Sequence, residues 1–426
     1  MKNIAQIREI SVLSFNERVL QEAEDGLNPL LERLKFLGIF SSNMDEFFKV
    51  RVASVQRRIE IGKKNMVAVL DHINEKAQEL DGRFRDAYRA IIAGLDAEGI
   101  RLIDEGELAQ KDNSIKSWVK EYFRDTVLPS LVPIIIRDGL PFPQLTDGAV
   151  YFAVMIWGSS FSYALLELPD ALPRFVELPD GCIMYVDDVI RYSLDEIFYI
   201  FEYESIGAYE FKISRDAELD IDNDFSEGYV RKMEKVLQQR KGGRPTRFVY
   251  DNQMPAELLH LLKKSLRLGK SDTAIGGGRY HNMRDLMRFP GKRRDLIFDI
   301  MEPHDHPVLD GGRGPMLDLI SGQDLLLTYP YQSFDHVIRL LREAAIDPEV
   351  GEIKMTLYRV ADQSQVINAL LNAARNGKKV VVVIELQARF DEHRNINNSE
   401  RLREGGATVL FGVPPMKVHA KLLLIN

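Results

Sequence analysis

The stretch VPPMKVHAKLLLIN, residues 413–426, is the one on which the rest of the chain converges. Its part from 418 to 425 is short and mostly apolar, which is typical of a buried strand. Side chains alternate between the two faces of a strand, so His419 and Lys421 are predicted to point the same way. A neighbouring cation favours the neutral, nucleophilic form of an imidazole. The pair therefore indicates either a reactive site or a structural histidine near a strand end, and this stretch alone does not decide between them.

The residues before this stretch alternate between strand-like and helical patterns. This alternation predicts a mostly parallel sheet with crossover helices. The expected strands are 353–359, 380–386 and 407–411, and the expected helices are 333–345, 363–376 and 397–404. In such sheets, ligands bind beyond the carboxyl ends of the strands.

Two arginines stand at consecutive carboxyl ends of these strands. Arg359 ends the first expected strand, and Arg389 follows the second. A guanidinium group offers several planar donors that suit phosphate oxygens. Any one arginine is more often a surface residue. Two of them, with His419 and Lys421 on a further strand, predict a phosphate site.

The first 104 residues predict a helical domain. Apolar residues recur there at helical spacing, and a long helix is expected over 71–98, which together predict a helical hairpin or bundle. Asn43 lies where one helix is expected to start, so the residues alone favour a helix cap for it. The other expected start signals are Ser14 with Glu17, and Asn28 with Pro29.

Residues 105–307 mix strand-like and helical segments, which predicts an α+β domain. The expected strands are 150–157, 161–168, 182–186, 198–203 and 247–250, and the expected helices are 116–128, 225–239 and 255–266. The acidic stretch 217–224 resembles a calcium loop but has Phe225 where such a loop needs glycine, so we expect a turn. The glycine-rich stretch 276–281 lacks the lysine and hydroxyl residue that end a phosphate loop, and is weak evidence for nucleotide binding.

Composition narrows the class of protein. The chain of 426 residues has a single cysteine, Cys182, which excludes an intrachain disulfide framework and favours a reducing compartment. No signal peptide or membrane span is recognisable, so we expect a cytoplasmic protein and leave peripheral membrane contact open. A net charge of −8 argues against nucleic-acid binding. It leaves a polyanionic substrate open, because basic clusters such as 263–270 and 292–294 occur.

Six stretches resemble the long-chain polyphosphate kinases, and they follow the same order from the N-terminus to the last residue. They are FLGIFSSNMDEFFKVRVA (36–53), GGRYHNMRDL (277–286), YPYQSF (329–334), IKMTLYRVA (353–361), ELQARFDEHRNI (385–396) and KVHAKLLLI (417–425). That family resembles phospholipase D in the fold that carries its paired HxK motifs. The phospholipase motif continues with four residues and an aspartate, whereas this chain has Asn426, which fits a phosphotransferase better.

The resemblance implies a multidomain α and α/β fold. Residues 1–104 would form a helical N-terminal domain on the side of the ATP base. Residues 105–307 would form an α+β head domain with dimer contacts. Residues 308–426 would form the start of a phospholipase D-like α/β catalytic domain. The implied activity is reversible transfer of the terminal phosphate of ATP to inorganic polyphosphate, with Mg²⁺.

The resemblance also assigns site residues. His419 is similar to the histidine that carries the phosphate, Lys421 would support the same phosphates, and Asn43 matches a residue that contacts ATP. Arg359 and Arg389 match residues of the magnesium and phosphate site. Arginine has no lone pair for a metal, so we assign both to phosphate oxygens and assign no direct protein ligand to the metal.

The same resemblance predicts which molecules the protein binds, where it is located and whether this chain is the whole enzyme. The expected partners are ATP or ADP, inorganic polyphosphate and further copies of the chain in a dimer or tetramer, without nucleic acid. The expected location is the cytoplasm, with association at the inner face of the membrane left open. Because the chain stops after the first HxK motif, we expect an N-terminal fragment of the enzyme. The alternatives are a non-catalytic polyphosphate- or nucleotide-binding fragment and a phospholipase D-like phosphodiesterase.

Overall fold

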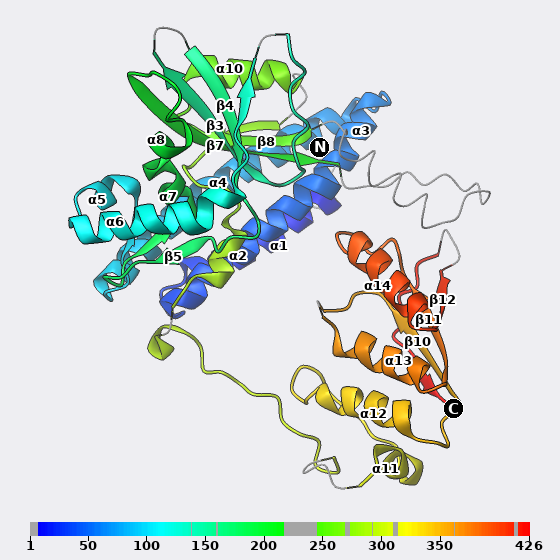
Figure 1. Ribbon diagram of the computed structural model, residues 1–426. Coiled ribbons are helices and arrows are strands. Elements are labelled where there is room, and N and C mark those ends of the chain that lie inside the picture. The colour runs from blue at the N-terminus through cyan, green and yellow to red at the C-terminus, as the bar shows by residue number, and fades with distance from the viewer. Residues whose placement is uncertain are drawn as a thin grey trace. The chain divides into compact units, whose positions relative to one another are not determined.

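The computed structural model divides into two compact units, each described by itself (Figure 1). Up to Asp299 the described residues belong to the first unit, and from Ile300 to the second. The described residues are 7–137, 139–158, 161–216, 245–268, 273–291, 293–309, 314–361, 363–412 and 416–426. The acidic stretch, the helix expected at 225–239 and parts of both basic clusters lie outside these ranges.

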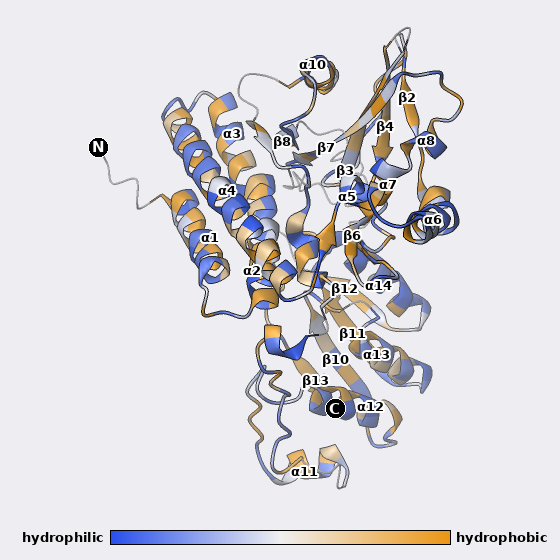
Figure 2. Ribbon diagram, turned by 90° about the vertical axis from the view of Figure 1, so that its left-hand side faces the viewer, coloured by the Kyte–Doolittle hydropathy of each residue, from blue (hydrophilic) through white to orange (hydrophobic). Residues whose placement is uncertain are grey.

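The first unit begins with four helical segments that pack around an apolar core. They are α1 (Arg8–Glu24), α2 (Leu30–Phe47) with its π-helical continuation η2 (Phe48–Val52), α3 (Ala53–Glu60) and α4 (Asn65–Ala97). Helices α1, α2 and α4 carry both hydrophilic and hydrophobic residues along their length, as expected for helices with one buried face (Figure 2). The predicted helical N-terminal region is therefore confirmed.

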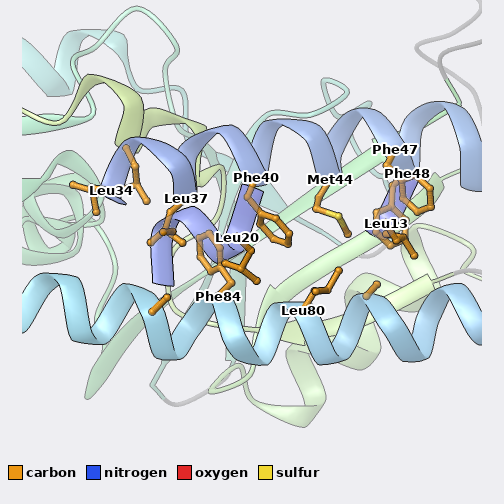
Figure 3. Packing of buried hydrophobic residues seen from close by; sticks show 14 of the residues in the cluster. Leu13, Leu20, Leu34, Leu37, Phe40, Met44, Phe47, Phe48, Leu80 and Phe84 are labelled. Carbon is orange, nitrogen blue, oxygen red and sulfur yellow. The ribbon is translucent and has the colours of Figure 1, made fainter. Parts of the chain in front are cut away.

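Helix α2 supplies the central stripe of this core. Leu34, Leu37, Phe40, Met44 and Phe47 recur every three or four residues and point toward α1 and α4 (Figure 3). Leu34 and Leu37 are fully buried, and burial of one such side chain contributes about 2 kcal/mol to folding.

Two helix starts expected from the sequence are wrong. Asn43 lies inside α2, and Ser14 lies inside α1. Glu17, expected to cap a helix, pairs with Arg83 on α4 at 2.5 Å. In both helices the apolar stripe continues past the polar residue, and tertiary burial outweighs its capping preference.

The first unit continues with two sheets. The larger has the order β2-β4-β3-β7-β8-β9 and is antiparallel except for the parallel pair of β8 with β9. Its strands are β2 (Ile134–Ile136), β3 (Val150–Trp157), β4 (Phe161–Glu167), β7 (Ser205–Arg215), β8 (Pro245–Asp251) and β9 (Thr273–Gly277). The smaller has the order β1-β6-β5, with β1 (Leu102–Ile103), β5 (Phe175–Glu177) and β6 (Ile183–Tyr185). The predicted α+β character is confirmed.

Short helices accompany these sheets. They are α5 (Glu105–Ala109), α6 (Asn113–Tyr122), η3 (Phe123–Val127), η4 (Leu128–Ser130), α7 (Val186–Tyr192), α8 (Leu194–Ile197), α10 (Ala256–Ser265), η5 (Met283–Arg288) and η6 (Arg294–Leu296). The strand expected at 198–203 is wrong. Phe198 is buried there, but Tyr199 and Ile200 are largely exposed where the chain turns.

The second unit contains a four-stranded sheet with the order β12-β11-β10-β13 (Figure 2). Strands β10 (Glu352–Leu357), β11 (Lys379–Ile384) and β12 (Thr408–Phe411) are parallel, which confirms the predicted α/β pattern. Its helices are α11 (Met316–Gly322), α12 (Asp335–Ile346), α13 (Gln365–Arg375) and α14 (Glu392–Glu404).

The last strand differs from the expectation. Only β13 (Leu423–Ile425) forms, it runs antiparallel to β10, and it is not buried. Just before it, the hydroxyl of Thr356 on β10 donates to the carbonyl of Ala420 at 2.6 Å and accepts from the amide of Leu422 at 2.9 Å. The amide of Thr356 still donates to the carbonyl of Leu422 at 3.0 Å. The hydroxyl therefore replaces the return bond from the amide of Leu422, and the regular strand begins at Leu423, later than predicted.

Candidate functional site

The candidate site lies where β10 and β11 end and the segment before β13 begins. The ring of Tyr358, just after β10, is its centre. The ring of His419 meets it edge-on with centroids 5.0 Å apart, and Lys421 Nζ lies 5.0 Å from its centroid. The guanidinium carbon of Arg359 lies 5.7 Å from the same centroid. The structure therefore brings three of the predicted site residues together around one aromatic ring.

Arg359 is linked to the end of the neighbouring strand. Its Nη2 donates to the carbonyl of Arg389 at 3.0 Å, and its Nε lies 2.9 Å from a carboxylate oxygen of Asp391. The side chain of Arg359 is still 54% exposed. It therefore keeps surface for a ligand while its direction is fixed, and the main chain at Arg389 lies beside it.

His419 and Lys421 are both exposed, and they are not arranged as two side chains on one strand face. Lys421 Nζ donates to the backbone carbonyl of His419 at 2.6 Å. The two side chains are nevertheless neighbours, because both pack against Tyr358. The predicted proximity is confirmed, while the predicted strand that would produce it is wrong.

Glu385 holds the segment that carries His419, and sequence reasoning missed it. This carboxylate follows β11 and is only 4% exposed. One of its oxygens accepts from the amide of Val418 at 2.7 Å, and the other accepts from the amide of Gln387 at 2.8 Å. An acidic residue directly after an apolar strand was the available signal. Tyr358, also missed, stands between that strand and Arg359.

A cavity of about 560 Å³ opens beside Tyr358, Arg359 and Lys421. Ser364 and Gln365, where α13 begins, line it as well. The first amides of a helix and its dipole favour an anion. The combined cations and helix start make this a suitable environment for phosphate oxygens.

The site offers little to a metal ion. Asp391 already pairs with Arg359 and Arg394, and Glu385 is engaged with two amides. Within the described residues, no group of three or more histidine, cysteine, aspartate or glutamate side chains could hold a metal ion.

Three family models match successive parts of the chain. They are the polyphosphate kinase N-terminal domain over residues 6–103, the middle domain over 114–289, and C-terminal domain 1 over 315–426. The chain belongs to the polyphosphate kinase family.

Curated relatives and a solved structure agree with this family. The polyphosphate kinase of Vibrio cholerae is 44% identical over 434 residues, which cover 98% of this chain and 62% of the relative. That of Escherichia coli strain K12 is 40% identical, with 98% and 63% covered. The crystal structure of polyphosphate kinase from Porphyromonas gingivalis matches with a TM-score of 0.76 at 37% identity, covering 98% of this chain and 61% of that one.

The chain thus spans somewhat less than two thirds of the length of these polyphosphate kinases. The three matched domain models give no support to the predicted truncation, which stays a prediction. Asn43, the residue predicted to contact ATP, is partly buried on α2 in the first unit, whereas the cluster around Tyr358 lies in the second. No helix in the described part of the chain is long and apolar enough to cross a membrane.

Proposed function

We propose that the protein transfers the terminal phosphate of ATP to inorganic polyphosphate, reversibly, through a phosphate carried on His419. The observation that supports this most strongly is the exposed imidazole of His419, which packs on the ring of Tyr358 together with Lys421 and Arg359. Membership of the polyphosphate kinase family supplies the reaction class. An exposed imidazole can reach a phosphorus atom, and cations within the same cluster suit the charge that accumulates there.

The proposed reaction has two steps. A nitrogen of His419 attacks the γ-phosphorus of ATP, a nitrogen–phosphorus bond forms, and the bond to the β-phosphate oxygen breaks to release ADP. A terminal oxygen of polyphosphate then attacks the phosphohistidine, which lengthens the polymer by one phosphate and frees the imidazole. In both steps Arg359, Arg389 and Lys421 would neutralise the phosphate oxygens, which is the main demand of phosphoryl transfer.

The proposal also covers how ATP is contacted and how Mg²⁺ is held. Asn43 would contact ATP. Arginine cannot ligate Mg²⁺, and the carboxylates beside Arg359 are engaged in ion pairs and hydrogen bonds. We therefore propose that Mg²⁺ enters with the phosphates of ATP, and that these side chains contact phosphate oxygens.

The proposed setting follows the family. We propose a cytoplasmic homodimer or tetramer with contacts through the predicted head domain, residues 105–307, and with peripheral membrane association left to experiment. The predicted domain limits, 1–104, 105–307 and 308–426, are kept as part of this proposal.

Labelling with ATP that carries a radioactive γ-phosphate tests the carrier. We expect acid-labile, base-stable label on the chain, its loss in His419→Ala, and its retention in His393→Ala. His393 is an exposed histidine of α14 and serves as the matched control. Equal labelling of both variants would refute the assignment of His419. A folded chain that takes no label at all would favour the non-catalytic alternative.

A further inference from the structure

A second cavity lies inside the first unit, apart from the cluster around Tyr358. It has a volume of about 580 Å³ and lies between helices α2 and α4 on one side and strands β7, β8 and β9 on the other. Asn43 is not among its lining residues, although its neighbours Met44 and Asp45 are. The proposed reaction makes no use of this cavity.

The charges that line it favour an anion. Among the described lining residues five are arginine or lysine and two are aspartate. Asp45 is shared by Lys212 and Arg247, which lie opposite it on β7 and β8. Burial would raise the pKa of Asp45, but Lys212 and Arg247 lower it below its usual value, so the carboxylate stays charged. The other three cations are paired: Arg85 with Asp81, Arg89 with Asp86, and Arg279 with Glu105 and Asp188. The excess positive charge therefore rests on Lys212 and Arg247, which share one carboxylate.

Several nitrogens around the cavity have incomplete hydrogen bonding. Arg247 reaches Asp45 only at 3.4 Å through Nη1, and its buried Nε has no hydrogen-bond partner in the described part of the chain. The same holds for Nε of Arg279 and for Nε2 of His281, which is 7% exposed. Buried polar groups are normally paired, and an unpaired one costs free energy. A set of three, all on residues that line one cavity, points to a missing ligand.

The opposite wall is aromatic and apolar. Phe40 and Phe84 stack with centroids 5.7 Å apart, and Tyr88 and Val249 continue this wall. Gly278 also lines the cavity, and an added Cβ there would meet nothing within 4 Å. The lining therefore combines aromatic rings for a flat ligand, cations for an anionic group, and a stretch of backbone without a side chain at Gly278.

We propose that this cavity binds a nucleoside phosphate, with the base against Phe40 and Phe84 and the phosphate toward Lys212 and Arg247. It would be a nucleotide site separate from the one that supplies the transferred phosphate. The glycine-rich stretch 276–281 would then take part in nucleotide binding without forming a phosphate loop.

An azido analogue of ATP, crosslinked to the 426-residue chain by light, tests the proposal. We expect label on peptides from 77–89 or 273–283, which line the cavity, and protection by ATP. The same label is expected in the His419→Ala chain. The test of this cavity is therefore independent of the test of His419 as the phosphate carrier. Absence of label from both segments in the unmodified chain would overturn the proposal.

A matched pair of variants locates the ligand. Gly278→Leu places a side chain in the open space of the cavity, whereas Gly82→Leu adds the same side chain on α4, also without a close contact. We expect labelling to fall about tenfold in Gly278→Leu only, since a blocked site loses most of its affinity. Equal labelling of both variants, with unchanged melting temperatures, would refute the location. Equal protection by inorganic tripolyphosphate and ATP would refute a role for the base.

Discussion

His281 is predicted to remain uncharged in the folded protein at neutral and mildly acidic pH. Its imidazole is buried, and its backbone amide donates to Glu210 at 2.8 Å. Burial makes the largest contribution to lowering the pKa of this imidazole, and the nearby charges of Lys212 and Arg247 lower it further, to about 3. The ordinary histidine value is 6.5. The unfolded chain therefore binds a proton that the folded chain rejects over the range between these values.

The sign and size of the effect on stability follow from this difference. The contribution of His281 is fully present above pH 6.5 and is lost as the pH falls toward 3. One pKa unit corresponds to about 1.36 kcal/mol. A pH of about 5 lies about 1.5 units below the pKa of the unfolded chain. At that pH the free energy of unfolding is therefore lower by about 2 kcal/mol. The result depends little on the folded pKa as long as that value lies well below 5.

Urea unfolding of wild type and His281→Gln, at about pH 7.5 and at about pH 5, measures this quantity. Both tryptophans, Trp118 and Trp157, lie in the first unit, so fluorescence reports on the unit that contains His281. We expect the free-energy difference between the two chains to change by about 2 kcal/mol between the two pH values. An exposed-histidine control, His260→Gln, should alter stability by less than about 0.5 kcal/mol.

Asp188 acts in the opposite direction and must be separated from this effect. Burial raises its pKa to about 7, so its contribution is present below 3.8 and is lost as the pH rises through 7. Because Asp188 is present in both chains, its effect cancels in the difference between them. A difference that is the same at both pH values would refute the buried neutral state of His281. So would an imidazole NMR signal of His281 that titrates above about pH 5.

Three further substitutions have expected outcomes. Arg191→Met should destabilise the first unit by about 3 kcal/mol in urea unfolding, because the buried carboxyl groups of Glu210 and Asp188 lose the guanidinium with which both pair. A smaller loss would mean that the carboxylate finds another partner. Gly38→Ala should cost about 2 kcal/mol by the same assay, because its Cβ would lie 2.7 Å from Met287 Cγ and 2.9 Å from Met287 N. Unchanged stability would show that this backbone shifts freely. Arg359→Ala should slow phosphohistidine formation about a hundredfold in rapid-quench labelling, and an unchanged rate would remove this arginine from the proposed mechanism.

The elements that could be predicted from the sequence are those with a local cause. Strands β3 and β11 are continuous apolar runs, and α2 repeats its apolar residues at helical spacing. Strand β7 escaped prediction because Glu210 and Lys212 interrupt its pattern, yet both are buried. Their partners, such as Arg191 and Asp45, come from distant parts of the chain. A polar residue that is buried by remote pairing gives no local sign of burial.

The candidate site shows the same division between local and remote causes. Arg359 could be placed because the carboxyl end of a parallel strand is a local feature, and in the structure its side chain donates to the main-chain carbonyl of Arg389. The strand predicted for 418–422 does not form. At Leu422 one backbone bond to Thr356 remains, while the hydroxyl of Thr356 takes the amide of Leu422 and the carbonyl of Ala420. Periodicity assumes that the backbone groups of a strand pair with another backbone, and a side-chain hydroxyl breaks that assumption. The consequence bears on His419, since a segment outside the ladder leaves its imidazole exposed at the edge of Tyr358. The irregular backbone before β13 is therefore what presents the proposed nucleophile to a ligand.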